Sequence, residues 1–493
     1  MRQTLFLIAL LMFAADFAIN CARPKATAQS IVLQPCNVPQ LAAKAQCGNL
    51  EVFENRATRN GRKISLKILV LPATGKDRAA DPLFYIPGGP GSSATKDAPG
   101  VAAIAAKIHE RHDLVFLDQR GTGGSHALNC EFYNKSDPQS YLEYFFPLED
   151  VKKCRQQLEA TSDLKLYTTP IAMDDLDEVR AALGYEKINI FGGSYGTRAA
   201  LVYLRQHPEH VRTIILQGVA PTYQFMPYDF PQGNERALQG IINECAADVA
   251  CGTAFPNLAA ETKSVLRRLM QGPVEVELPA PNVSGAASSA TTIRVKLSRD
   301  LAAEAIRYML YNPLAASRVP LVLHQAANGN FVPLVRNALR YRQALVGSGS
   351  NGMYLSITCA EDLPWIKPGE GERLAANTFL GDYRLRQQRE ACALWPRASI
   401  PAGYSEPVRG SAPVLILTGQ WDPVTPPENG DKAARYLPNS LHIVVPHGGH
   451  GLDGLDGIEC VDNLITQFIE EGSTKNLTTD CVKNIKRKGF AVK

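Results

Sequence analysis

The chain has 493 residues and an almost balanced charge, with 52 lysines and arginines against 48 aspartates and glutamates and a formal net charge of +4. Without a long basic block, this balance excludes an extended nucleic-acid-binding surface, so we expect no nucleic-acid partner. Hydrophobic residues make up 45% of the chain and charged residues 20%, which excludes a largely disordered protein. The length fits an α/β core enlarged by one inserted domain.

The first 28 residues have the pattern of an export signal. A basic start is followed by an apolar run over residues 5–13, which is too short for a membrane-spanning helix. A small-x-small pattern then offers a cleavage point after Ala28. We therefore predict an exported protein, periplasmic or extracellular, with no membrane segment once the signal is removed. Cys21 leaves a lipid anchor open as an alternative, although the residues before it are bulkier than those of lipoprotein signals.

Cleavage after Ala28 leaves ten cysteines, an even number in a compartment where disulfides persist. They fall into five couples that are close in sequence: Cys36 with Cys47, Cys130 with Cys154, Cys245 with Cys251, Cys359 with Cys392, and Cys460 with Cys481. We predict a disulfide in each couple, with free thiols or crossed pairs as the alternative. A zinc site is not indicated, because the cysteines form no CxxC pair and the histidines do not cluster beside them.

The first part of the chain alternates apolar strand patterns with helical ones. Residues 64–71 alternate apolar and polar side chains, as an early antiparallel strand does. Three short runs are continuously apolar, which is typical of parallel strands buried on both faces: residues 83–86, 114–117 and 188–191. The other predicted elements are helices over residues 174–183 and 197–207 and a strand over 211–216. This order predicts a mostly parallel sheet with helices on both faces.

The pattern changes between residues 221 and 410. Helical periodicity over residues 302–310 and 334–345, with a polar stretch at 284–292, predicts a mainly helical inserted cap domain. The strand pattern returns at residues 414–417 and 441–445, and a helix follows over 458–470. We therefore predict four parts: a signal at 1–28, a first core part at 29–220, a cap at 221–410 and a second core part at 411–493.

Ser194 lies in the pattern Gly192-Gly-Ser194-Tyr-Gly196, between a predicted buried strand and a predicted helix. A nucleophile elbow needs this arrangement, because the serine takes a strained backbone conformation and the glycines let strand and helix pass closely. The five-residue pattern is weak evidence alone, but its flanking elements are those the elbow requires. We predict that Ser194 is a catalytic nucleophile.

A serine nucleophile needs a base, and in this fold the acid and then the histidine follow later in the chain. Asp422 follows the strand at 414–417, and His450 follows the strand at 441–445 within a glycine-rich loop. Both lie where open α/β sheets place reactive groups, at the carboxyl ends of strands. The alternatives are His447 or His442 as the base, and a purely turn-forming role for Asp422 in its Asp-Pro pair.

The third requirement is an oxyanion hole formed by backbone N–H groups. Tyr195, directly after the serine, supplies one by its position. The loop Pro87-Gly-Gly-Pro-Gly91 is expected to supply the second, from Gly89 or, as the alternative, Gly88. A phosphate-binding loop is excluded, since the lysine and hydroxyl residue of a P-loop are missing.

These motifs, together with Asp118-Gln-Arg-Gly121, resemble those of the bacterial tripeptidyl aminopeptidase and prolyl iminopeptidase family of α/β-hydrolases. The similarity covers about residues 80–220 and 355–465, and Pro87 replaces the histidine usual in prolyl iminopeptidases, which favours the tripeptidyl branch. The resemblance implies a serine exopeptidase that acts on the free amino terminus of peptide substrates and needs no cofactor or metal. Asp118 and Arg120 are expected to stabilise the core loop.

An aminopeptidase must also bind the ammonium group of its substrate, most simply with carboxylates. Glu361 and Asp362 are the candidates, in a segment that resembles one in the tripeptidyl group, although they could equally be surface or turn acids. An exported carboxylesterase with the same triad is the alternative function, because fold alone does not choose a substrate. A binding module on an inactive scaffold is disfavoured, since all three triad candidates are present. The sequence leaves the oligomeric state open.

Overall fold

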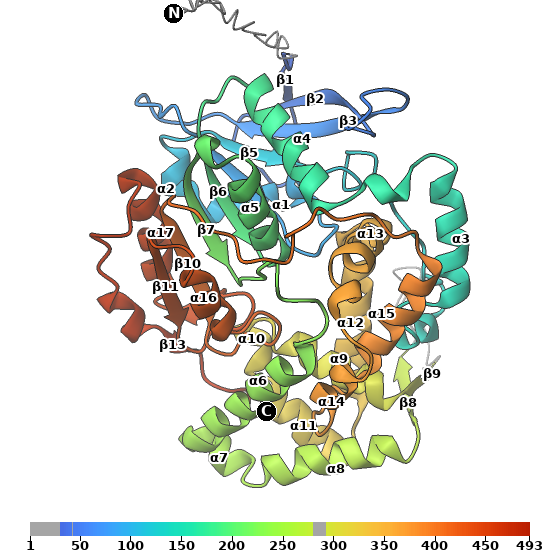
Figure 1. The fold of residues 1–493 in the computed structure, drawn as a ribbon. Coiled ribbons are helices and arrows are strands. Elements are labelled where there is room, and N and C mark those ends of the chain that lie inside the picture. The colour runs from blue at the N-terminus through green and yellow to red at the C-terminus, as the bar shows by residue number, and fades with distance from the viewer. Residues whose placement is uncertain (1–29, 42, 280–291) are drawn as a thin grey trace, which may run out of the picture.

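A nine-stranded sheet forms the centre of the computed structural model, which describes residues 30–41, 43–279 and 292–493 (Figure 1). The strand order is β1-β2-β3-β5-β4-β6-β7-β10-β11. The strands are β1 (Gln34–Cys36), β2 (Ala45–Phe53), β3 (Lys63–Leu71), β4 (Leu83–Ile86), β5 (Leu114–Leu117), β6 (Ile188–Gly193), β7 (Val211–Gln217), β10 (Val414–Gly419) and β11 (Ser440–Val445). Pairs from β1 to β5 are antiparallel, and all pairs from β5 to β11 are parallel. The predicted, mostly parallel sheet is confirmed.

The continuously apolar runs form the parallel strands because side chains on both faces of these strands are buried. Strands β4 and β5 have the predicted bounds, and β6 and β10 run on into the glycines of the turns that follow. Ile190 of β6 packs on one face of the sheet and Phe191 on the other, and Ile416 and Leu415 of β10 repeat this alternation.

Helices cover both faces of the sheet, as Figure 1 shows. The helices on the Phe191 face are α1 (Ala94–Ile104), α2 (Ala106–His109) and α17 (Glu459–Glu471). Those on the opposite face are α4 (Thr169–Ala182), α5 (Tyr195–Gln206) and α16 (Pro427–Ala434). Helix α4 begins five residues before the predicted start at Asp174, because Pro170 is tolerated in a first helical turn. Gly184, with φ of +83°, follows its end.

Between β7 and β10 the chain forms a layer of helices beyond one end of the sheet (Figure 1). Its helices are α6 (Phe230–Ala247), α7 (Val249–Ala254), α8 (Leu258–Met270), α9 (Arg299–Met309), α10 (Pro313–Ala316), α11 (Val319–Ala327), α12 (Val332–Ser348), α13 (Asn351–Glu361), α14 (Glu370–Ala375) and α15 (Tyr383–Leu394). Strands β8 (Val274–Pro279) and β9 (Thr292–Leu297) pair antiparallel beside them. Most of these helices share an apolar core of their own, to which Leu238, Ile306 and Leu334 belong.

The remaining elements are short. They are α3 (Leu148–Glu159), β12 (Leu455–Asp456), β13 (Lys486–Arg487) and the 3₁₀ helices Pro138–Leu142, Leu164–Leu166, Pro208–His210, Leu363–Trp365 and Asp480–Asn484. The predicted signal at 1–28, with its cleavage point and Cys21, lies outside the described residues, as does most of the polar stretch at 284–292. In the described part of the chain, no helix has both the length and the apolar character needed to cross a membrane.

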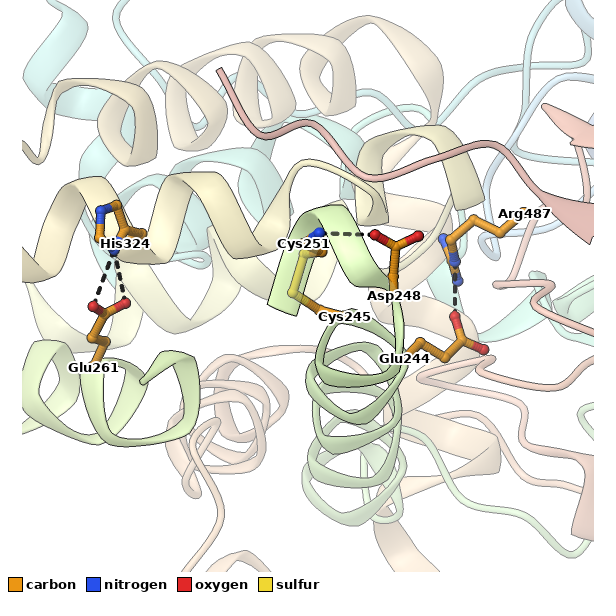
Figure 2. Close-up of a disulfide and its surroundings, with 7 residues drawn as sticks. All are labelled: Glu244, Cys245, Asp248, Cys251, Glu261, His324 and Arg487. Atoms are coloured by element: carbon orange, nitrogen blue, oxygen red, sulfur yellow. Dashed lines mark hydrogen bonds and ion pairs between the residues drawn. A yellow bond between two sulfur atoms is a disulfide. The ribbon is translucent and has the colours of Figure 1, made fainter. Parts of the chain in front are cut away.

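All five predicted disulfides are formed, so the predicted pairing of sequence neighbours is confirmed. Cys36–Cys47 links β1 to β2, and Cys359–Cys392 links α13 to α15. Figure 2 shows Cys245–Cys251, which links the last turn of α6 to α7. Each bridge therefore stabilises a local segment and does not tie distant parts of the chain together.

Candidate active site

Ser194 occupies the sharp turn between β6 and α5. Its φ of +55° and ψ of −123° are strained for a residue with a side chain. The turn requires glycine on both sides of the serine because a side chain would not fit. A Cβ on Gly196 would lie 2.0 Å from the carbonyl oxygen of Ile86, and a Cβ on Gly192 would lie 2.5 Å from the carbonyl oxygen of Gly196. The turn therefore has the backbone of a nucleophile elbow, which presents the serine hydroxyl at the end of the sheet.

Asp422 and His450 meet at the neighbouring strand ends, in the loops after β10 and β11. The Asp422 Oδ2 lies 2.8 Å from the His450 Nδ1. The other oxygen, Oδ1, accepts hydrogen bonds from the backbone N–H groups of Val424 and Thr425 at 2.9 and 2.8 Å. Burial raises the pKa of Asp422, but the facing His450 and the Thr425 hydrogen bonds outweigh burial and hold this pKa below its ordinary value. The carboxylate therefore stays ionised beside the histidine.

The two alternative histidines have other partners. The His447 Nδ1 lies 2.7 Å from Glu244 Oε1, and His447 has a φ of +59°. His442 lies within β11, where its Nδ1 is 2.9 Å from Asp431. Of the three histidines considered, His450 is the one that is paired with Asp422.

A cavity of about 360 Å³ lies between the sheet end and the helices inserted between β7 and β10. Ser194 and His450 both line this cavity, together with Gly88, Gly89 and Thr425. The structure thus brings the predicted serine and the histidine that is paired with Asp422 to one cavity, where a substrate carbonyl could meet them.

The glycine loop after β4 passes directly over the serine. A Cβ on Gly88 would lie 3.0 Å from the Cβ of Ser194, and Gly89 has a φ of +112°, which only glycine adopts readily. Tyr195 is the first residue of α5, so its N–H has no carbonyl four residues back within the helix to bond. Of the two predicted oxyanion donors, Tyr195 thus adjoins the serine in α5, and Gly89 lines the same cavity as the serine.

A family model described as the alpha/beta hydrolase fold matches residues 81–452. The chain belongs to this family. The matched residues include the elbow, the glycine loop and the loops that carry Asp422 and His450.

Three known proteins resemble this hydrolase. Serine protease Hip1 of Mycobacterium tuberculosis (strain ATCC 25618 / H37Rv) is 26% identical over 505 residues, which cover 93% of this chain and 92% of Hip1. Carboxylesterase B of Mycobacterium tuberculosis (strain CDC 1551 / Oshkosh) is 26% identical over 468 residues, covering 89% and 86%. Tripeptidyl aminopeptidase of Streptomyces lividans is 34% identical over 189 residues, which cover 35% of each chain.

Asp118 and Arg120 stabilise loops of the hydrolase core, as expected. Asp118 is buried, and its two oxygens accept four hydrogen bonds, two of them from the backbone of Thr95 and Gly124. The buried Arg120 donates its Nε to Asp175 at 2.6 Å. These side chains have internal partners and do not line the cavity with Ser194.

Glu361 and Asp362, the predicted ammonium ligands, are fully buried at the end of α13. Glu361 accepts hydrogen bonds from the backbone and hydroxyl of Thr169 and from the hydroxyl of Tyr404. Asp362 forms an ion pair with Arg198 at 2.8 Å. Neither residue is among the described residues that line the cavity, so the structure does not bring them together with Ser194.

Thr425, which no sequence motif indicated, contacts both members of the hydrolase's aspartate–histidine pair. Its hydroxyl donates to Asp422 Oδ2 at 2.6 Å and lies 3.0 Å from His450 Nδ1. Its only local signal is its place three residues after the aspartate, where side-chain-to-backbone turns are common. Thr425 therefore fixes the orientation of the carboxylate.

Glu244 of α6, which no sequence motif indicated either, holds the two loops beside the site. Its Oε1 accepts a hydrogen bond from Trp421 Nε1 at 2.6 Å and lies 2.7 Å from His447 Nδ1. Its Oε2 accepts from Arg487 Nε at 2.8 Å, as Figure 2 shows. Trp421 and His447 belong to the loops that carry the aspartate and the histidine. Glu244 thus connects an inserted helix to both loops.

We expect Glu244→Gln to lower kcat/KM by roughly tenfold and the melting temperature by a few degrees, because it removes a charge from this network. Burial raises the pKa of Glu244, but hydrogen bonds from His447 and Trp421 and the charge of Arg487 lower it to about 2. Since the folded pKa lies below the unfolded value of about 4, this stabilisation is present above pH 4 and lost as the pH falls to about 2.

Thermal melts of wild type and Glu244→Gln between pH 2 and 8 test this expectation. The difference in melting temperature between wild type and Glu244→Gln should disappear at about pH 2. Glu261→Gln is the matched control, because Glu261 pairs with His324 elsewhere among the inserted helices (Figure 2). An equal loss of activity in the control would contradict a special role for Glu244.

Asp97 of α1 makes the stability of this hydrolase depend on pH in the direction opposite to that expected for Glu244. Burial raises the pKa of Asp97 to about 6, with a further contribution from the charge of Asp118. Because the folded pKa exceeds the unfolded one, the stabilisation is present below pH 4 and lost as the pH rises through about 6. We expect Asp97→Asn to raise the melting temperature at pH 7.5 relative to wild type and to gain little at pH 4. Melts at both pH values, with exposed Asp77→Asn as control, measure this difference.

Proposed function

We propose that the chain is an exported serine peptidase that releases residues or short peptides from the free amino terminus of peptides. The observation that carries this proposal is the shared cavity: Ser194, in the strained elbow, and His450, paired with Asp422, both line it. A serine, a base and an orienting acid in this arrangement are the parts that acyl transfer needs.

In the proposed reaction, His450 takes the proton of Ser194 through Nε2, because its Nδ1 faces Asp422. The serine oxygen attacks the substrate carbonyl, and the backbone N–H groups of Gly89 and Tyr195 bind the oxyanion. His450 then gives its proton to the leaving amine. Water, activated by the same histidine, attacks the acyl-enzyme and releases the acyl group.

Three observations support the finer parts of this proposal. The five disulfides fit an oxidising compartment, which agrees with the predicted export signal. The similarity to Serine protease Hip1 extends along almost the whole chain and favours a peptide substrate. The similarity to a tripeptidyl aminopeptidase favours action at the amino terminus. Ammonium binding by Glu361 and Asp362 stays a prediction, and it would require these buried carboxylates to exchange their present partners.

A carboxylesterase with the same catalytic residues is the second candidate function. It is favoured by the similarity to Carboxylesterase B, which covers 89% of this chain. Esters need less activation than amides, so the same site could hydrolyse them without any change in its parts.

Hydrolysis of paired chromogenic tripeptide amides distinguishes the two functions. The members of a pair are identical except that one has a free amino terminus and the other is acetylated, and a short-chain ester is measured in parallel. A strong preference for the free amine is the expected result. Turnover of the ester alone would reject the peptidase. Labelling with a fluorophosphonate reports a working Ser194 in both cases and shows that a negative result is not caused by inactive protein.

A further inference from the structure

Two arginines stand on the wall of the cavity opposite the sheet. Arg307 of α9 and Arg384 of α15 both line it, and their side chains are only 2% and 4% exposed. The carboxylate beside them is Glu304, whose oxygens accept from Arg307 Nε and Nη2 at 2.8 and 3.0 Å. Its distance to Arg384 Nε is longer, 3.8 Å. Two buried cations thus share one carboxylate.

This cluster has an unbalanced positive charge. Burial raises the pKa of Glu304, but the charges of Arg307 and Arg384 lower it to about 2, so the glutamate is ionised and balances only one arginine. Among the described residues that line the cavity, none is an aspartate or a glutamate. A buried charge without a partner is unfavourable, and a bound anion would relieve it.

Arg384 is the arginine with unused donors. Its Nη2 donates to the Tyr354 hydroxyl at 3.3 Å, whereas its Nε and Nη1 are buried and have no hydrogen-bond partner. Its guanidinium lies 3.7 Å from the centre of the Phe145 ring, which holds the group in place. Arg307, in contrast, donates to Glu304 and to the hydroxyls of Tyr308 and Tyr311. Because each Nη carries two hydrogens, the edge formed by the unused Nη1 and the second hydrogen of Nη2 can bind a carboxylate with two parallel hydrogen bonds.

The cluster is also connected to the catalytic centre. Arg307 Nη1 donates to the Tyr311 hydroxyl at 2.6 Å, and the Tyr311 ring meets the His450 ring edge-on with 5.0 Å between their centres. One tyrosine therefore separates the arginine from the histidine, so a peptide held at Ser194 can place a nearby side chain at the arginines.

We propose that Arg384, supported by Arg307, binds a carboxylate of the substrate, so that the enzyme prefers peptides with a glutamate or aspartate in the segment held by the cavity. This inference rests on the proposed function in one respect: it takes the substrate to be a peptide. The arginine subsite itself depends only on the contacts of the cavity wall.

The first test uses wild-type enzyme and tripeptide amides with a free amino terminus that carry glutamate, glutamine or lysine at each of the three positions in turn. At one position, kcat/KM for glutamate should exceed that for glutamine by roughly 10- to 100-fold, as for a hydrogen-bonded charge pair, with lysine lowest. Equal rates for glutamate and glutamine at all three positions would overturn the proposal.

The second test changes the arginine. Arg384→Met should bring the glutamate-to-glutamine ratio close to one, and Arg384→Lys should keep part of the preference. Arg386→Met is the matched control on the same helix, because Arg386 is 48% exposed and pairs with Asp300 at 3.7 Å. Fluorophosphonate labelling and thermal melts confirm that each variant is folded. A full preference retained by folded Arg384→Met would overturn the assignment.

A third test separates failure of the subsite from failure of the peptidase. If wild type hydrolyses only esters, the p-nitrophenyl ester of glutaric acid is compared with that of pentanoic acid, which has no carboxylate. Faster hydrolysis of the charged ester, lost in Arg384→Met, supports the subsite although the peptidase is rejected. Equal hydrolysis of the two esters rejects the subsite.

Discussion

Ser194→Ala is expected to abolish turnover of every substrate, with a loss of kcat of roughly 10⁴- to 10⁶-fold, and to leave the fold unchanged. The reason is that the hydroxyl is the proposed acyl acceptor, and no other group at the elbow can take its place. Alanine keeps the Cβ that the turn already accommodates. Steady-state kinetics with the best peptide amide, together with a thermal melt, measure both parts of this expectation.

The matched control for this variant is Ser92→Ala. Ser92 lines the same cavity but is not part of the elbow, so its removal should change kcat by only a few-fold. Fluorophosphonate should label wild type and Ser92→Ala and leave Ser194→Ala unlabelled. Turnover by Ser194→Ala at the rate of wild type would reject the nucleophile and with it the proposed function.

The second large effect is expected for Asp422→Asn, with a loss of kcat of roughly 10³- to 10⁴-fold. The buried carboxylate accepts a hydrogen bond from the Nδ1–H of His450, which leaves Nε2 free to take the proton of the serine. An asparagine can instead donate its amide N–H to Nδ1, which favours the wrong tautomer of the histidine. Thr425→Val leaves the carboxylate in place and removes one hydrogen bond to it, so a loss of only about tenfold is expected.

Kinetics at saturating substrate measure these losses, because an effect on the histidine changes kcat more than KM. Asp431→Asn is the control, since Asp431 pairs with His442, the histidine inside β11. If Asp422→Asn kept more than a tenth of the wild-type kcat, Asp422 would not be the residue that orients the base.

The core of the fold was predictable because its signals are local. The apolar runs at Leu83–Ile86 and Leu114–Leu117 became strands with those bounds, and the elbow could be recognised from five residues and their flanking elements. The positions of Asp422 and His450 followed from a rule of the fold, that reactive groups lie at strand ends in a fixed chain order. The cysteine couples followed from sequence proximity.

The surroundings of the site were not predictable, because they depend on contacts between distant segments. Glu244 reaches Trp421, 177 residues later, and Arg384 lies near Glu304, 80 residues earlier, with no motif at either end. Glu361 and Asp362 show the same difficulty. Their partners Thr169 and Arg198 lie more than 150 residues earlier, so the sequence could not tell a buried, bonded acid from one open to substrate.

The strand order has a consequence for when the hydrolase can first act. Strand β10, next to the edge strand β11, pairs with β7 on its other side, although all the inserted helices separate it from β7 in the chain. Ser194 is therefore synthesised long before Asp422 and His450. The sheet beside it stays incomplete until β10, which begins at Val414, has paired with β7. A chain that is still being synthesised lacks Asp422, His450 and the strands that precede them, so the candidate catalytic triad can assemble only when synthesis of the core is almost complete.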